Sequence, residues 1–357
     1  MISGVLGRYF ARHFFKTVIS VFLGVFNLIF TVNLAESLRR SGDHPNVGPA
    51  LTAWLAFLHT PIVAEQALPF AVLLGSMIAF LNLSRRLELV VARAAGVSVW
   101  QFLAPAILVA MLIGAVEITV YNPLSTAMKR QSETLEAKLY GTSSSNAGFW
   151  LRQKSVDGQT IIRVDARDAD DVFLRVQAFN FDADGTFSQR VDAEQAILRD
   201  GYWEMRNATV VMPGFDAQTA GEVLLASNLS QEEVSQAFVE AETVSFWNLA
   251  SLASQVERAG LNATAYRLKF QQLIALPALL AAMVLLASCF SLRLFRMGGV
   301  QKMVLGGVAS GFMLYVATKI VGDLGGVGVV SPLVAGWLPA VVGCLIGVLV
   351  LLHQEDG

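Results

Sequence analysis

The residues of this chain best suited to chemistry are charged side chains set among long apolar runs. Residues 84–99, S-R-R-L-E-L-V-V-A-R-A-A-G-V-S-V, lie between two such runs and carry Arg85, Arg86, Glu88 and Arg93. The segment is too short and too charged to cross a bilayer, and its three arginines favour the cytoplasmic face. We expect a small helix whose one acid, Glu88, suits a basic groove on a soluble partner. The alternative is an ordinary basic cytoplasmic loop.

Arg39 and Arg40 form a second charged group, after the first apolar run and on the opposite side of the membrane. Planar guanidinium groups pair well with phosphate, so these arginines could bind an anionic lipid head group. Lys319, late in the fifth apolar run, lies on the same side and could join them. The simpler alternative is that the arginines only end a helix in water, and that Asp323 pairs with Lys319.

Glu65 and Glu117 are ionisable residues within or at the edge of apolar runs. Such residues are unfavourable in lipid and usually face a protein interior or a wet cavity. They therefore belong either to a functional site or to hydrogen bonds between helices. The sequence contains no G-x-x-x-x-G-K-[ST] phosphate loop, no suitable Ser/His/Asp or Cys/His set and no Cys/His metal cluster, so no catalytic activity and no metal site are predicted.

The composition of the chain is that of a membrane protein. It has 357 residues, 54% of them hydrophobic and 15% charged, and a mean hydropathy of +0.55. Soluble domains carry about 25% charged residues. The net charge of −2 argues against a nucleic-acid partner, and both cysteines fall in apolar runs, so no disulfide framework is expected.

Six apolar runs are long enough to cross a hydrocarbon core about 30 Å thick. They lie near residues 14–34, 52–83, 101–121, 273–294, 303–322 and 333–352. Basic loops before the first run, after the second and after the fourth predict that both termini are cytoplasmic. The first run is too long for a signal peptide, so we expect it to remain as a span.

Short alternating stretches between the third and fourth runs predict an antiparallel β-domain on the trans side, which in a bacterium is the periplasm. The predicted strands are Phe149–Lys154, Thr160–Val164, Val172–Phe181, Val191–Leu198 and Tyr202–Met212, with turns at Asp157-Gly158, Asp184-Gly185 and Asp200-Gly201. An amphipathic helix from Ser245 to Gly260 follows. The expected fold class is thus membrane α-helical, three spans plus three, with an inserted periplasmic all-β domain. The expected divisions are 1–121, 122–263 and 264–357.

Residues 84–98, which follow a proline-containing second span, resemble the coupling segment of the lipopolysaccharide export permeases LptF and LptG. Four shorter patterns are also similar to that family: E-x-x-x-x-x-P at 117–123, G-F-W at 148–150, W-x-M-x-N-A at 203–208 and P-x-x-x-G-W-L-P at 332–339. The order of spans and β-domain agrees as well, so the resemblance covers nearly the whole chain. The arginine pair and the G-F-W-L-R region are closer to LptG.

The resemblance implies a permease subunit of an ATP-driven exporter, which extracts lipopolysaccharide from the inner membrane and passes it to a periplasmic bridge protein. The implied partners are a second, LptF-like permease, an LptB-like ATPase dimer and an LptC-like membrane protein. ATP and Mg²⁺ would bind to the ATPase, and this chain would hold no cofactor. The β-domain would be β-jellyroll-like.

The resemblance also implies roles for particular residues. The segment 84–98 would be the coupling helix, and the residues that meet the ATPase would be Arg86, Glu88, Leu89 and Arg93. Lipid phosphates would meet Arg39 and Arg40, with Lys319 beside them. A further cation found in some relatives is replaced here by Asn33.

Three alternatives remain open at the level of sequence. The chain could be the LptF-type paralogue, or a non-transporting membrane scaffold whose periplasmic domain binds a partner. It could also be another kind of ATP-driven permease, such as a lipoprotein-releasing or efflux type, although those commonly place four spans around their extracytoplasmic domain. A membrane-bound enzyme is least favoured because no catalytic constellation is present.

Overall fold

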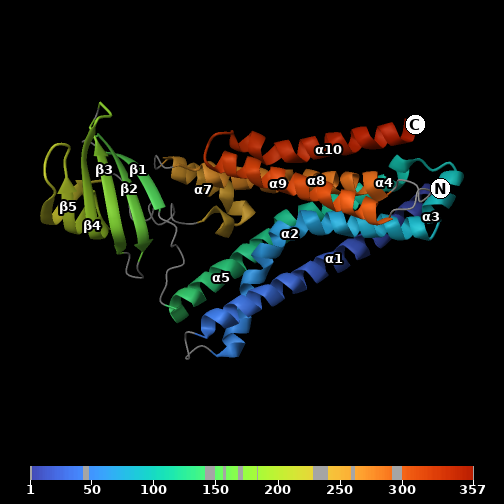
Figure 1. Ribbon diagram of the computed structural model, residues 1–357, viewed down its shortest axis with the longest axis horizontal. Coiled ribbons are helices and arrows are strands. Elements are labelled where there is room, and N and C mark those ends of the chain that lie inside the picture. Colours follow the sequence, from blue (N-terminus) through green and yellow to red (C-terminus); the bar gives the residue numbers. More distant parts are fainter. Residues whose placement is uncertain are drawn as a thin grey trace. The chain divides into compact units, whose positions relative to one another are not determined.

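A computed structural model of the chain describes residues 2–42, 48–140, 149–155, 158–167, 172–182, 184–227, 240–258, 262–291 and 300–356. These residues form two compact units (Figure 1). The helical unit comprises Met1–Lys129, Ser245–Trp247 and Arg267–Gly357. The β unit comprises Arg130–Val244 and Asn248–Tyr266, and is therefore an insertion within the helical unit.

The helices are mostly long and apolar. Before the sheet they are α1 (Ile2–Ser41), α2 (Pro49–Arg85), α3 (Glu88–Ala94), α4 (Val99–Val116) and α5 (Asn122–Tyr140). After the sheet they are α7 (Phe246–Arg258), α8 (Thr264–Ser291), α9 (Val300–Gly326) and α10 (Pro332–Asp356). Six helical segments among the described residues are long and apolar enough to span a membrane, three before the sheet and three after it. The expected six-span fold with an inserted β-domain is confirmed.

α2 and α8 form the centre of the helical unit. In the most apolar window of each helix, 61% of the residues of α2 and 72% of those of α8 are buried, against 17% for α9. Val72 and Leu73 of α2 and Met283 and Val284 of α8 are fully enclosed in one apolar cluster that also takes in residues of α1, α4, α9 and α10. A helix that is apolar all round is stable only when covered by other helices or by lipid, and α2 and α8 are covered by helices.

Glycines let helices approach one another at backbone distance, and Gly75 and Gly114 are two examples. A Cβ on Gly75 of α2 would lie 2.8 Å from the Cα of Val18 in α1, and one on Gly114 of α4 would lie 2.8 Å from the Cα of Pro277 in α8. Small residues at helix crossings are a common means of packing spans closely, because larger side chains would hold the backbones apart.

The third span changes its winding where it leaves the apolar core. A π-turn, η1 (Glu117–Tyr121), connects α4 to α5, and the Asn122 N–H bonds to the Glu117 carbonyl. Pro123 has no N–H and its ring would clash with the carbonyl four residues earlier, so a regular α-helix cannot continue unchanged. The wider turn lets the helix go on as α5. The sequence had suggested that helical structure ends near Asn122, and this was wrong.

In the described part of the inserted region, six strands form a single antiparallel sheet with the order β1-β2-β3-β4-β5-β6. They are β1 (Phe149–Ser155), β2 (Gly158–Arg167), β3 (Phe173–Phe181), β4 (Phe187–Arg199), β5 (Tyr202–Val211) and β6 (Gln218–Ala226). Gly185 and Gly201 take φ values of 78° and 89° at two of the predicted turns, where a side chain would be strained. β6 is a strand that the sequence analysis missed, and Asp157 lies outside the described residues.

Hydrogen bonds connect the first strand to the last two, so the sheet is curved around a filled interior. Gln153 of β1 donates to the Ala226 carbonyl at the end of β6 (3.0 Å) and accepts from Ser227 Oγ (2.8 Å) and Trp203 Nε1 (3.4 Å). Trp203 of β5 is fully buried and packs edge-on against Phe173, with ring centroids 5.1 Å apart. Trp203 therefore fills the concave side between β1 and β5. The β-jellyroll-like topology stays a prediction.

Candidate functional site

The charged segment after α2 forms a sharp corner and then a short helix. α2 continues to Arg85, Leu87 has a left-handed backbone (φ 60°), and α3 begins at Glu88. The expected helix over 84–98 is thus limited to seven residues, because Gly96 (φ 83°) and the Ser98 cap of α4 end it.

The side chains of this segment present charge together with apolar surface. Arg86 and Arg93 are exposed, and Leu87 and Val91 are 61% and 66% exposed. Glu88 accepts a hydrogen bond from the Tyr9 hydroxyl of α1 at 3.3 Å. The side chain of Leu89 lies outside the described residues. Exposed apolar side chains beside charges of both signs are typical of a surface that a protein partner covers.

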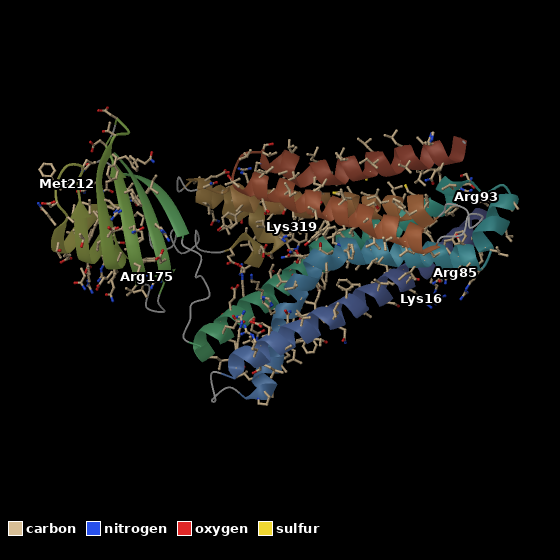
Figure 2. The ribbon with its side chains drawn as sticks, viewed as in Figure 1. Lys16, Arg85, Arg93, Arg175, Met212 and Lys319 are labelled. Carbon is tan, nitrogen blue, oxygen red and sulfur yellow. The ribbon has the colours of Figure 1, made fainter. Side chains whose placement is uncertain are left out.

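The basic residues gather at one end of the helical unit. Figure 2 shows Lys16, Arg85 and Arg93 near the end at which both termini lie, and Lys319 away from it. Lys319 is exposed and forms no hydrogen bond or ion pair within the described part of the chain, so Asp323 does not pair with it there.

Arg39 and Arg40 share one acidic partner, Glu36, one turn earlier in α1. Glu36 Oε1 lies 2.8 Å from Arg39 Nη2 and 2.9 Å from Arg40 Nε. The two arginine side chains remain 75% and 66% exposed. The net charge of Glu36, Arg39 and Arg40 together is therefore +1, at a position open to solvent. Asn33, one turn before Glu36, donates to Thr60 of α2 (3.3 Å).

A buried polar group, here called the Glu65 cluster, consists of Glu65, Asn122, Ser125 and Lys269. Lys269 Nζ of α8 lies 3.0 Å from Glu65 Oε1 of α2. Asn122 Nδ2 donates to both Glu65 oxygens at 3.1 Å, and Ser125 Oγ donates to Oε2 at 2.9 Å. Glu65 is only 6% exposed. The cluster therefore satisfies a charge inside the helical unit with a lysine and three hydrogen bonds from α5.

The Glu65 cluster also holds the two connections to the inserted domain. Asn122 is the first residue of α5, which leads out of the helical unit. Its Oδ1 accepts a hydrogen bond from the Phe246 N–H (2.9 Å), where the chain returns. The Phe246 ring stacks on Phe270 of α8, with centroids 5.3 Å apart and planes 7° from parallel. The segment that leaves the helical unit and the segment that returns to it are therefore held together at Asn122 and Phe246.

Glu117, the second intramembrane acid, lies beside this cluster. It is 3% exposed, it interacts electrostatically with Glu65 and Lys269, and its two carboxyl oxygens have no hydrogen-bond partner among the described residues. Tyr121, four residues on, donates to the Pro61 carbonyl (3.1 Å). The structure thus brings the two predicted glutamates, Glu65 and Glu117, to the same region.

Sequence reasoning missed three members of the cluster. Lys269 precedes the predicted fourth span at 273–294, so it was not recognised as a buried partner. Asn122 and Ser125 were assigned to the start of the β-domain. One signal could have revealed Lys269: an acid within the second span needs a partner, and a cation at a similar depth on another span can supply it.

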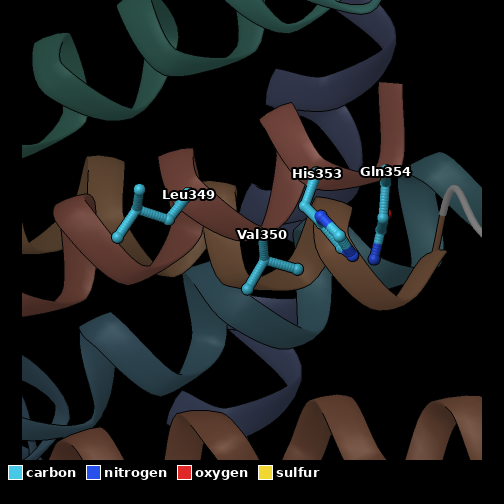
Figure 3. Close-up of a pocket in the computed structure, with 4 residues that line it drawn as sticks. All are labelled: Leu349, Val350, His353 and Gln354. Atoms are coloured by element: carbon cyan, nitrogen blue, oxygen red, sulfur yellow. The ribbon is translucent and has the colours of Figure 1, made fainter. Parts of the chain in front are cut away.

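A shallow hollow of about 400 Å³ lies near the C-terminal end of α10 and is lined by Leu349, Val350, His353 and Gln354 (Figure 3). None of these four residues belongs to the groups above. In the parts of the chain searched for metal ligands, no three His, Cys, Asp or Glu side chains are placed to hold an ion.

Comparison with known proteins agrees with this architecture. The family model described as lipopolysaccharide export system permease LptF/LptG matches residues 8–353. The chain belongs to this family. It is 23% identical over 369 residues to the lipopolysaccharide export system permease protein LptG of Escherichia coli K12, covering 99% of each chain. It is 22% identical over 361 residues to LptG of Haemophilus influenzae, covering 96% of this chain and 94% of the relative.

Membership of the family decides the class of function. The chain is a permease subunit of the lipopolysaccharide export system, and a multi-pass protein of the inner membrane. Of the interpretations left open by the sequence, neither the scaffold nor the LptF-type paralogue is favoured, since the curated relatives are LptG proteins.

Proposed function

We propose that this permease is the LptG-type subunit and is driven by an LptB-like ATPase dimer that docks on the segment around α3. The observation that carries the docking site is the exposed mixture of Leu87, Val91, Arg86 and Arg93 around Glu88, at the end of the central helix α2. Leu89 belongs to the same segment. ATP and Mg²⁺ bind to the ATPase, and this chain transmits the resulting movement.

The direct attachment of α3 to α2 supports this proposal physically. α2 is the most buried span of the first group, so a force applied at its cytoplasmic end is passed to the packed core. The hydrogen bond from Tyr9 to Glu88 connects the same point to α1. A partner that moves α3 would therefore move two spans together.

The test is purification of the full-length chain in mild detergent and identification of the proteins that accompany it. We expect a second, LptF-like permease and a small cytoplasmic ATPase. Glu88→Arg should reduce the amount of ATPase that co-purifies. The substitution replaces the one acid of α3 with a positive charge, which a basic groove on the ATPase would repel. Glu222→Arg, on the exposed side of β6, is the matched control. Equal recovery of the ATPase with both variants would refute the docking site.

We also propose that Arg39 and Arg40 bind lipopolysaccharide phosphates, with Lys319 adding positive charge. The two guanidinium groups lie on adjacent residues and are 75% and 66% exposed, and planar guanidinium groups bind phosphate oxygens well. The pair Arg39→Ala with Arg40→Ala should reduce crosslinking to lipopolysaccharide in cells without loss of folded protein. Crosslinking at the wild-type level in a folded double variant would contradict the phosphate site.

The remaining partners follow from the proposed transport route. Lipopolysaccharide is extracted from the inner membrane between this chain and the LptF-like subunit, and moves toward an LptC-like protein and the periplasmic bridge. In this proposal both termini are cytoplasmic and the inserted β-domain is periplasmic. The gathering of Lys16, Arg85 and Arg93 near the end that carries the termini supports this orientation (Figure 2).

A further inference from the structure

Two buried carboxyl groups lie near one lysine, and only one of them is satisfied. Glu65 receives Lys269, Asn122 and Ser125, whereas Glu117 receives no hydrogen bond from any described residue although it is 97% buried. Native structures leave few buried polar groups without partners. Glu117 is therefore in an unfavourable position in this conformation, and a second conformation in which it is paired would explain its presence.

Lys269 is the cation that can pair with Glu117. The charges of Lys269 and Glu65 both act on Glu117, and Lys269 Nζ itself lies 3.0 Å from Glu65 Oε1. The ammonium group is a compact charge on a flexible four-carbon stem, which suits it to exchange between two carboxylates.

Glu117 also lies on the part of the third span that can change its winding. It opens the π-turn η1, and such turns are frequent at functional sites. When the extra residue of a π-turn moves along a helix, the residues that it passes rotate by about 100°, since an α-helix has 3.6 residues per turn. A rotation of this kind can turn Glu117 toward or away from Lys269 while the helix stays intact.

We propose that Lys269 exchanges between Glu65 and Glu117 during each transport cycle, which makes Glu117 a positioning residue for lipopolysaccharide transport. The inference rests on the proposed function, because the ATPase supplies the movement through α2. Asn122 bonds to both Glu65 and the Phe246 N–H, so the exchange moves the exit and return connections of the β-domain together. The movement of the spans is thereby delivered to that domain.

The test uses the complete exporter reconstituted in proteoliposomes that contain lipopolysaccharide, with lipopolysaccharide release, ATP hydrolysis and melting temperature measured for each variant. Glu117→Gln keeps the shape of the side chain but offers no negative charge to Lys269. Glu117→Asp keeps the charge on a shorter stem. Glu222→Gln, an exposed glutamate of β6, is the matched control.

We expect Glu117→Gln to reduce release about tenfold while ATP hydrolysis stays within about twofold of wild type, as for loss of one coupling interaction. Its melting temperature should not fall, because the buried acid has no partner to lose. Glu117→Asp should recover a large part of the release. Release near the wild-type level in Glu117→Gln would overturn the inference, as would an aspartate variant as inactive as the glutamine variant.

Two further outcomes are distinct from these. A parallel fall of release, ATP hydrolysis and melting temperature in Glu117→Gln would show a purely structural role and would also overturn the inference. Absence of release from the wild-type exporter would instead overturn the proposed function itself. The two failures are therefore separated by the wild-type measurement.

Discussion

At the scale of single residues, the Glu65 cluster shows how a charge is kept inside the helical unit. The ion pair with Lys269 joins α2 to α8, and the side-chain donors of Asn122 and Ser125 occupy the carboxylate oxygens. A buried ion pair adds little net stability compared with apolar residues of similar volume, but removal of one partner leaves the other charge uncompensated. The pair is thus best tested by comparing single and double substitutions.

Lys269→Met should lower the free energy of unfolding by about 3–5 kcal/mol, since Glu65 then remains buried with only neutral partners. The double variant Glu65→Leu with Lys269→Met should recover most of this loss. The measurement is the melting temperature of each purified variant in the same detergent. If the double variant were less stable than Lys269→Met alone, the account of an uncompensated charge would be incorrect.

Glu204 in β5 gives the β unit a dependence on pH. Hydrogen bonds from Arg206 (Nε, 2.6 Å) and Arg199 (Nε, 3.3 Å) hold the pKa of Glu204 below its ordinary value. A carboxyl group with a lowered pKa stabilises the fold above its unfolded pKa, and this contribution is lost as the pH falls through the folded pKa.

Hydrogen exchange of peptides from β4 and β5 should therefore accelerate as the pH falls below the ordinary titration range of glutamate, near pH 4.3, after correction for the intrinsic rate. Glu204→Gln should exchange faster at neutral pH and show less change on acidification. An identical pH profile for the variant and the wild type would rule out Glu204 as the source.

At the scale of elements, close helix contacts depend on glycines that meet backbone rather than side chains. Gly75→Ala would place a Cβ 2.8 Å from the Cα of Val18, which cannot move without displacing α1. Gly307→Ala in α9 would come closest to the end of the Met77 side chain, a flexible group, and would touch the Phe290 Cβ only at an ordinary 3.4 Å.

We therefore expect Gly75→Ala to lower the melting temperature and the yield of folded protein clearly more than Gly307→Ala does. Thermal unfolding of both variants in the same detergent checks this order. The reverse order would mean that α1 and α2 can separate more easily than the contact at Val18 indicates.

The elements that the sequence predicted well are those with a simple hydrophobic period. Six apolar runs predicted six spans, and alternation predicted five of the six strands. β6 was missed because Gln218–Ala226 is largely exposed, so its sequence does not alternate. α5 was missed because Asn122-Pro123 suggests an end to a helix, and a local sequence pattern does not reveal that a π-turn can absorb a proline.

The site was less predictable than the fold for a physical reason. Glu65, Glu117 and the charged residues around α3 were found because charge within or beside apolar runs is visible in a sequence. Their partners were not, because Lys269 is 204 residues from Glu65 along the chain and no local pattern connects them. The ion pairs of Glu36 with Arg39 and Arg40 could have been predicted from the sequence, because residues three and four apart on a helix are neighbours.

At the scale of the whole molecule, the number of spans fixes the sidedness of the chain. Three spans precede the inserted domain and three follow it, and both termini lie at one end of the helical unit (Figure 1). If every span crosses the membrane, the termini share one side and the inserted domain lies on the other.

Single cysteines test this arrangement once Cys289 and Cys344 are replaced by alanine. Asp184→Cys, in the turn between β3 and β4, should react with a membrane-impermeant maleimide added to intact spheroplasts. Gln354→Cys, near the end of α10, should react only after permeabilisation. Labelling of both positions from the same side would contradict the three membrane crossings that separate Asp184 from Gln354.

The unequal lengths of the spans have a consequence for the surrounding bilayer. α2 has 37 residues and α10 has 25, or about 55 Å and 38 Å at 1.5 Å per residue. The longer helix is mostly enclosed by protein, whereas 17% of the window of α9 and 28% of that of α10 are buried in this chain. Hydrophobic mismatch therefore acts chiefly on the less buried helices, among them α1, with 6% of its window buried, α9 and α10. These helices can tilt as the membrane thickness changes, while the enclosed α2 keeps its inclination. The thickness of the host membrane therefore affects the angle between these helices and α2.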